Sequence, residues 1–220
     1  MAARKTNTTT PASAAADTRA RLLDAALSVI RRKGYPATTV DDLCAEAGVT
    51  KGSFFHYFKS KDALALAAIE HWNTMTGALF AQAPYHAPVD PRDRVLAYLE
   101  FREQLIAGEL PEFTCLLGTT VQETYATHPA LRAACDAGIR GHAATVAEDL
   151  ALAKARYAPE ADWEPMTIAL YTQATLQGAF ILAKAAGGPD IARACVRLLR
   201  DHVAALLGAP TGSLPPHASR

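Results

Sequence analysis

The 220-residue sequence lacks the segments that mark membrane-bound and exported proteins. No stretch approaches the roughly 20 uninterrupted apolar residues that a membrane-spanning helix needs, and the N-terminus does not have the basic-then-apolar order of a signal peptide. The motifs GxSxG, GxGxxG, HExxH and the P-loop, which mark common enzyme classes, are absent as well. We therefore expect a cytoplasmic protein that is not an enzyme, contacts no membrane and has neither cofactor nor catalytic residues.

Cysteine and histidine are too sparse and too scattered for a metal centre. The seven histidines include no pair at the spacing of a helical metal site, and the four cysteines include no CxxC pair. We expect no bound metal, and free thiols in a reducing compartment at Cys44, Cys115, Cys135 and Cys195.

Charge is balanced over the whole chain but unevenly distributed along it. The formal net charge is zero, from 22 basic and 22 acidic residues. Between Thr18 and Lys61, however, eight basic residues outnumber four acidic ones, whereas residues 62–220 carry a net charge of −5. This asymmetry indicates a small basic domain that binds a polyanion, joined to a larger acidic domain.

Apolar residues recur with a helical period, and no segment reads as a credible strand. We therefore predict an all-α fold with an N-terminal three-helix head and a C-terminal helical bundle. Proline and glycine separate the expected helices, which lie between Thr18 and Gly34 and at 40–47, 51–57, 61–81, 93–107, 112–127, 129–157, 162–186 and 189–207. Residues 1–17 and 209–220 are expected to be disordered tails.

The helices expected at 40–47 and 51–57 are too short to be stable alone. Thr39 and Thr50 can cap them, and Gly48 supplies the turn between them. They must share one small core with the first helix, built from Val40, Leu43, Cys44, Val49, Phe54 and Phe58.

Residues 38–61, TTVDDLCAEAGVTKGSFFHYFKSK, resemble the DNA-binding segment of the TetR family of transcriptional regulators. The shared pattern is a threonine cap, a small residue four positions before an obligatory glycine, Ser or Thr opening the recognition helix, and an aromatic-rich run ending in Lys-x-Lys. Cys44 stands where the family usually has alanine. The resemblance implies a helix-turn-helix DNA-binding domain at 18–64 and a ligand-binding and dimerisation domain at 65–208.

In a helix-turn-helix the second helix enters the major groove, and its first residues meet the base edges. Lys51 and Ser53 are the expected base readers, and Thr39, Lys59 and Lys61 the expected phosphate contacts. Phe55 and Tyr57 are expected to face DNA, with a place in the core as the competing interpretation. The complete expected DNA-binding set is Thr39, Thr50, Lys51, Gly52, Ser53, Phe55, His56, Tyr57, Lys59 and Lys61.

A second resemblance concerns the C-terminal part. Residues 113–118, FTCLLG, followed by QGAF at 177–180, are similar to a TetR subgroup in which some members sense electrophiles or oxidants through the cysteine. Thr114 replaces the glycine of that subgroup, so Cys115 is either a structural thiol or a sensing one. A ligand pocket needs apolar walls and a few polar groups. The expected ligand-binding residues are Phe101, Leu105, Phe113, Cys115, Leu116, Tyr125, His142, Tyr171, Gln173 and Gln177.

The family resemblance implies a homodimer that binds double-stranded DNA at a palindromic operator, binds a small-molecule effector and usually represses transcription. The last two expected helices are apolar on more than one face, which fits a seam between subunits or packing within the chain. Effector binding is expected to shift helix 61–81 and so change the spacing of the two heads. The alternative is an architectural DNA-binding protein without a ligand, for which the long aromatic-containing C-terminal part would not be needed.

Overall fold

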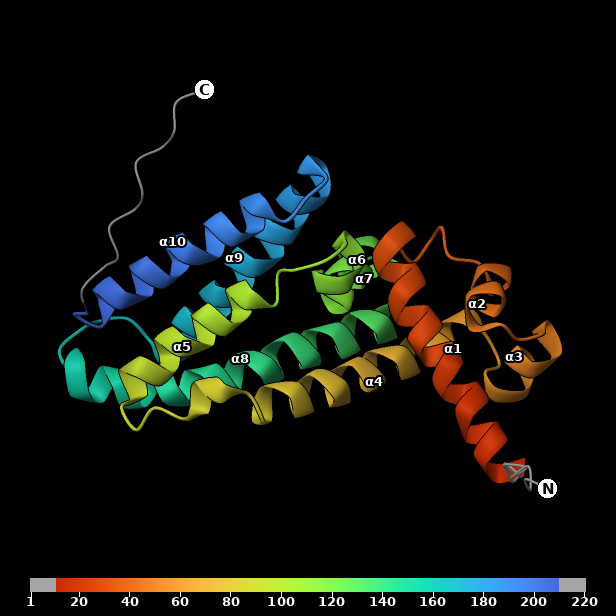
Figure 1. Ribbon diagram of the computed structural model, residues 1–220, viewed down its shortest axis with the longest axis horizontal. Helices are drawn as coiled ribbons and strands as arrows, with labels where there is room; N and C mark the ends of the chain where they lie inside the picture. Colours follow the sequence, from red (N-terminus) through yellow and green to blue (C-terminus); the bar gives the residue numbers. More distant parts are fainter. Residues whose placement is uncertain (1–10, 210–220) are drawn as a thin grey trace, which may run out of the picture.

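The computed structural model describes residues 11–209, with side chains from Asp17 onward, and throughout these residues the chain forms helices joined by loops (Figure 1). The expected all-α fold is confirmed. No helix in the described range is long and apolar enough to cross a membrane.

The head consists of α1 (Pro11–Lys33), α2 (Val40–Ala47) and α3 (Lys51–Tyr57), at the right of Figure 1. Helix α1 begins before the expected cap at Thr18, because the alanine-rich residues that precede it favour a helix. The expectation of disorder is therefore wrong for residues 11–17, which belong to α1. Residues 1–10 and 210–220, the rest of the expected tails, lie outside the described range.

The body begins with α4 (Lys61–Ala81) and a short 3-10 helix, η1 (Pro84–His86). It continues with α5 (Pro91–Gln104), α6 (Leu110–Phe113), α7 (Leu116–Thr124) and α8 (Pro129–Tyr157). Helices α9 (Pro165–Ala186) and α10 (Asp190–Leu206) complete it. Helix α8 packs against α4, α5, α7 and α9, whereas α10 packs against α5 and α9.

One expected helix is broken. Residues 112–127 were expected to form a single helix, but α6 ends at Phe113 and α7 starts at Leu116. Thr114 and Cys115 are extended between them. The Thr114 hydroxyl donates a 2.8 Å hydrogen bond back to the carbonyl of Leu110, and the Cys115 sulfur caps α7 by accepting the N–H of Gly118 at 3.4 Å. Such local side-chain bonds compete with helix continuation.

The core of the head continues into the body. Leu43, Cys44, Phe54 and Phe58 are buried as expected, and Val40 and Val49 pack against them. The same apolar cluster also contains side chains of α4, α7 and α8: Leu64, Ala65, Ala68, Ile69, Leu116, Leu117, Leu131 and Cys135. Side chains of the head and of the body are therefore packed together in one close-packed core.

Candidate nucleic-acid interface and ligand cavity

The turn between α2 and α3 is fixed by caps at both helices. The Thr39 side chain accepts the N–H of Asp42 at 3.1 Å, and the Asp42 carboxylate accepts the N–H of Thr39 at 2.8 Å. Gly48 ends α2 at a φ of 63°, which favours glycine. The Thr50 side chain caps α3 by accepting the N–H of Ser53 at 3.1 Å. The two helices are therefore held in one relative orientation.

Helix α3 has one side buried in the head core and another side exposed to solvent. Phe54 is fully buried and Phe58 nearly so. The Phe55 side chain is 55% exposed, so the competing interpretation of Phe55 as a core residue is wrong, whereas Tyr57 is half-buried and packs against the head core. The remaining expected contacts of α3 and its flanks are exposed, except for a half-buried Ser53: Thr50, Lys51, Gly52, His56 and Lys59.

The ammonium of Lys51 is already paired within the head. Its nitrogen lies 2.9 Å from the Asp41 carboxylate of α2, and this pair raises the pKa of Lys51. Both side chains are largely exposed, at 59% and 71%. Exposed ion pairs contribute little to stability, so a base edge or a phosphate can replace Asp41 as the partner of Lys51.

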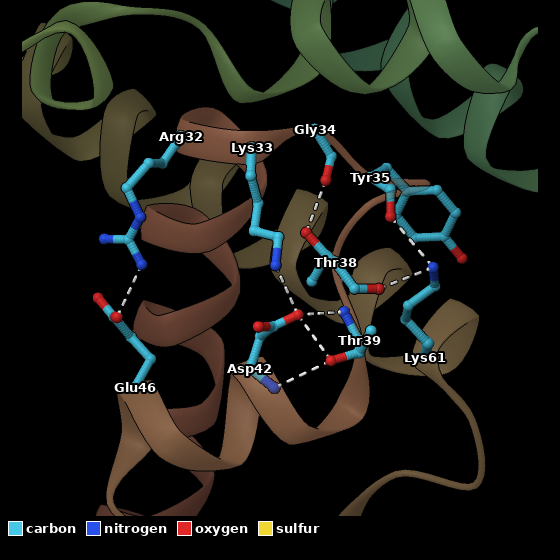
Figure 2. Close-up of polar contacts among 9 residues, drawn as sticks. All are labelled: Arg32, Lys33, Gly34, Tyr35, Thr38, Thr39, Asp42, Glu46 and Lys61. Carbon is cyan, nitrogen blue, oxygen red and sulfur yellow. Dashed lines mark hydrogen bonds and ion pairs between the residues drawn. The ribbon is translucent and has the colours of Figure 1, made fainter.

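The Lys61 side chain turns inward, and its ammonium is bonded within the protein rather than free to contact a phosphate. Its ammonium donates to the carbonyls of Tyr35 and Thr38, at 3.1 and 3.0 Å, and lies 4.2 Å from the centre of the Tyr35 ring (Figure 2). These contacts tie the start of α4 to the loop between α1 and α2. Residue types alone could not predict these bonds, because both acceptors are backbone atoms.

Two ion pairs brace α1 against α2 in the same region. Lys33 lies 2.8 Å from Asp42, and Arg32 lies 2.9 Å from Glu46 (Figure 2). The Lys33 ammonium and the bonds from Thr39 hold the pKa of Asp42 far below its usual range. Part of the basic charge of the head is therefore neutralised internally, which the count of charges along the sequence did not reveal.

A cavity of about 170 Å³ lies in the body and is lined by residues of α4, α5, α6, α7, α8 and α9 and of the loop after α5. Six of the expected ligand-binding residues line it: Leu105, Phe113, Cys115, His142, Gln173 and Gln177. Four do not. Phe101 packs against the Phe80 and Tyr85 rings, Leu116 is fully buried in the core shared with the head, Tyr125 is 61% exposed, and Tyr171 is 41% exposed with its ring against His202.

The sequence did not predict that α4 lines this cavity, and from α8 it predicted His142 alone. Helix α4 supplies Trp72, Asn73, Thr76, Leu79 and Phe80, and α8 supplies Gly138 and Ile139. The remaining lining residues are Arg102, Ile106, Glu112, Leu117 and Phe180. A signal existed in α4, because Trp72, Thr76, Leu79 and Phe80 recur at helical spacing on a face of their own.

Three polar side chains form a network at the cavity. The Gln173 amide donates to the Tyr98 hydroxyl at 3.3 Å, and that hydroxyl lies 3.0 Å from the His142 ring. Burial, together with the positive charge of Arg102, lowers the pKa of His142 to about 4. The imidazole is therefore neutral near pH 7, and its nitrogen can accept a hydrogen bond from the Tyr98 hydroxyl.

The cavity wall is bonded directly to α1. Arg31 donates to the carbonyls of Glu112 and Thr114, at 3.2 and 3.5 Å, and its guanidinium lies 4.9 Å from the centre of the Trp72 ring. Burial lowers the pKa of Arg31. One side chain of the head thus contacts both Glu112 of α6 and Trp72 of α4, two residues that line the cavity.

The two parts of the second motif, FTCLLG and QGAF, meet where Gly118 lies against Gln177. Gly118 and Gln177 come from α7 and α9, and a Cβ atom at Gly118 would lie 1.9 Å from the Gln177 side-chain oxygen. Any other residue at position 118 would force Gln177 out of its place beside the cavity. Among the described residues, no group of histidine, cysteine or acidic side chains could hold a metal ion.

Comparisons with known proteins agree with this geometry. Residues 22–68 match the model of bacterial regulatory proteins of the tetR family, and residues 91–199 match a tetracyclin repressor-like C-terminal domain. The transcriptional regulator AcuR of Cereibacter sphaeroides is 30% identical over 82% of this chain and 83% of its own length. The HTH-type transcriptional repressor NemR of Escherichia coli is 27% identical over 76% and 84%. A crystal structure of regulatory protein TetR from Rhodobacter sphaeroides has a TM-score of 0.75 at 29% identity, covering 84% of this chain and 98% of that one.

Proposed function

Because the chain belongs to the TetR family of bacterial regulatory proteins, we propose that it is a repressor that binds a palindromic operator as a homodimer and leaves it when a small molecule fills the cavity. Members of this family are DNA-binding transcriptional regulators rather than enzymes, and they form dimers and bind small-molecule effectors. We place its action in the cytoplasm, where bacterial DNA lies.

One observation carries the proposal: a single helix belongs to both sites. Helix α4 starts at Lys61, which is bonded to the loop of the head, and five of its later side chains line the cavity. A ligand that presses on Trp72 or Phe80 therefore acts on the helix that carries the head. Half-sites on DNA must match the spacing of the two heads, so a small tilt of α4 weakens operator binding.

The DNA-binding domain is assigned to residues 18–64 and the ligand-binding and dimerisation domain to 65–208, although α4 runs through the boundary. We assign base readout to Lys51 and Ser53, with Thr50 and Gly52 beside them at the start of α3, and phosphate contact to Lys59 and to Thr39, the cap of α2. Phe55 and His56, exposed on α3, are placed against the groove wall.

The subunit seam is assigned to α9 and α10. Both helices keep large apolar side chains exposed in the single chain: Met166, Tyr171, Ile181, Leu182, Ile191 and Leu198. Exposed apolar surface of this extent favours a partner, and a two-fold axis would bring the same helices of the second copy against it.

The thiol-sensor alternative is not favoured. The relatives are named as transcriptional regulators and repressors, and the Cys115 sulfur has a structural role as the cap of α7. An architectural DNA-binding protein would not need a cavity shared with α4. We therefore keep reversible ligand binding as the signal.

Selection of bound fragments from a random DNA pool, followed by fluorescence anisotropy with a metabolite library, tests the proposal. We expect an inverted repeat to be selected and some compounds to release the labelled DNA at a fixed protein concentration. Leu105→Trp, which fills part of the cavity, should still bind the repeat but respond less to those compounds. Selection of no defined sequence, or release by no compound, would refute the proposal.

A further inference from the structure

The cavity holds one cationic side chain that has nothing to pair with. Arg102 of α5 is half-buried and lines the cavity, and among the described residues its guanidinium has no hydrogen-bond or ion-pair partner. The guanidinium lies over the Phe80 ring, 5.2 Å from the ring centre. A guanidinium presents several donors in a planar fork that matches a carboxylate. Because Arg102 is only half-buried, water can solvate its free donors, and a carboxylate that enters the cavity can replace that water.

The other polar groups of the lining do not neutralise Arg102. His142 is neutral near pH 7, because burial and the charge of Arg102 lower its pKa to about 4. Glu112 is the one acidic side chain of the lining, and its carboxylate caps α6 by accepting the N–H of Glu109 at 2.7 Å. Gln177 and Asn73 line the cavity without a hydrogen-bond partner in the described part of the chain, so both are available to orient a ligand.

The aromatic residues of the cavity argue against a cationic ligand. Two of them already contact guanidinium groups of the protein, since Arg31 lies over Trp72 and Arg102 over Phe80. A ligand ammonium over Trp72 or Phe80 would have to displace one of these arginines. The rest of the lining is largely apolar, with Phe113 and Phe180 in contact at 6.1 Å between ring centres. A cavity of about 170 Å³ is close in size to the roughly 150 Å³ cavity that holds benzene in another protein.

We propose that the effector is a small monocarboxylate with an apolar body, whose carboxylate pairs with Arg102 while the body lies among Leu105, Phe113 and Phe180. This inference rests on the proposed function, since it names the chemical class of ligand for the same cavity. It also gives a route for the signal, because the carboxylate joins α5 to the polar side chains of α4 and α9.

The test uses charge-matched sets of two sizes: benzoate, benzamide and benzylamine, and butanoate, butanamide and butylamine. Each compound is titrated against the full-length dimer on its selected operator, with release of labelled DNA and thermal stability as readouts. We expect the carboxylates to stabilise the protein and release DNA, the amides to bind at least about tenfold more weakly, and the amines to have no effect.

Variants locate the contact. Arg102→Gln should raise the dissociation constant of the carboxylates by about tenfold to a hundredfold, and Arg102→Lys, which keeps the charge, by less. Arg140→Gln removes an exposed arginine of α8, paired only with Asp136, and should change nothing. The Lys variant keeps the test valid if Arg102→Gln folds poorly.

The outcomes separate this inference from the proposed function. Amides that match the carboxylates, amines that exceed them, or an Arg102→Gln protein with unchanged carboxylate affinity would overturn the assignment. So would inactivity of all six compounds when other members of the metabolite library release the operator, and the proposed function would then stand. If no compound of any charge releases DNA, the proposed function fails as well.

Discussion

The carboxylate of Glu123 accepts a hydrogen bond from the backbone N–H of Tyr35 at 2.7 Å, so that α7 holds the end of α1. The same helix places Leu117 in the cavity wall, and its Cys115 cap lies there as well. Glu123 thus forms a further connection between cavity and head, separate from α4 and from Arg31. Gly34 lies directly beside it, since a Cβ atom there would meet the Glu123 carboxylate at 2.4 Å.

We expect Glu123→Ala to weaken the coupling between effector and operator rather than either binding step alone. Removal of a hydrogen bond to a charged group should reduce the effector-induced loss of operator affinity by roughly threefold to tenfold. The measurement is operator affinity with and without saturating effector. Gln122→Ala, a neighbour whose side chain bonds only within α7, is the control. A coupling factor identical to wild type would exclude this connection.

Lys61 and Lys59 should differ although both are lysines at the start of α4. Lys61→Ala removes two hydrogen bonds and the contact with the Tyr35 ring, so the free energy of unfolding should fall by about 1–2 kcal/mol with little change in the salt dependence of DNA binding. Lys59→Ala should leave stability unchanged and flatten the slope of log affinity against log salt by about one unit. Chemical denaturation and salt titration check the pair. The opposite pattern would restore Lys61 as the phosphate contact.

Asp41 should lower the affinity of the protein for its operator, because its carboxylate pairs with Lys51. Asp41→Asn releases Lys51 and removes a negative charge near the phosphates, so operator affinity should rise about twofold to fivefold. Lys51→Ala should lower operator affinity roughly tenfold to a hundredfold and affinity for random DNA much less. Glu148→Gln, the same charge change at an exposed residue of α8, controls for net charge. An equal gain from Glu148→Gln would mean that the effect of Asp41 is not local.

Local signals in the sequence predicted the head better than the cavity. The bounds of α2, α3 and α4 follow from side-chain caps at Thr39, Thr50 and Ser60, and each cap is an oxygen that bonds nearby backbone. The break between α6 and α7 depends on one threonine and one cysteine acting as caps, for which propensity gives little warning. The inward turn of Lys61 and the isolation of Arg102 arise from residues distant in sequence, which only the packed fold brings together.

His142 should make the protein less stable below about pH 6.5. Its pKa is lowered from 6.5 to about 4 in the fold, first by burial and then by Arg102, so between these values the unfolded chain binds a proton that the folded chain does not. Stability is therefore fully present above pH 6.5 and is lost as the pH falls toward 4, by roughly 1–3 kcal/mol per chain. In His142→Gln the lost contact with Tyr98 lowers stability equally at every pH. The additional loss of stability as the pH falls from 6.5 to 4 should be absent from this variant.

Denaturation at a series of pH values, analysed as the difference between wild type and His142→Gln, isolates this histidine from the carboxylates, which titrate in both proteins. His56→Gln, a change at an exposed ring on α3, should leave the wild-type slope intact. Arg102→Gln should make the slope shallower, because the second cause of the lowered pKa is removed while burial remains. Parallel curves for wild type and His142→Gln would show that His142 titrates alike in the folded and unfolded chain. A slope unaffected by Arg102→Gln would show that the Arg102 charge does not lower the pKa of His142.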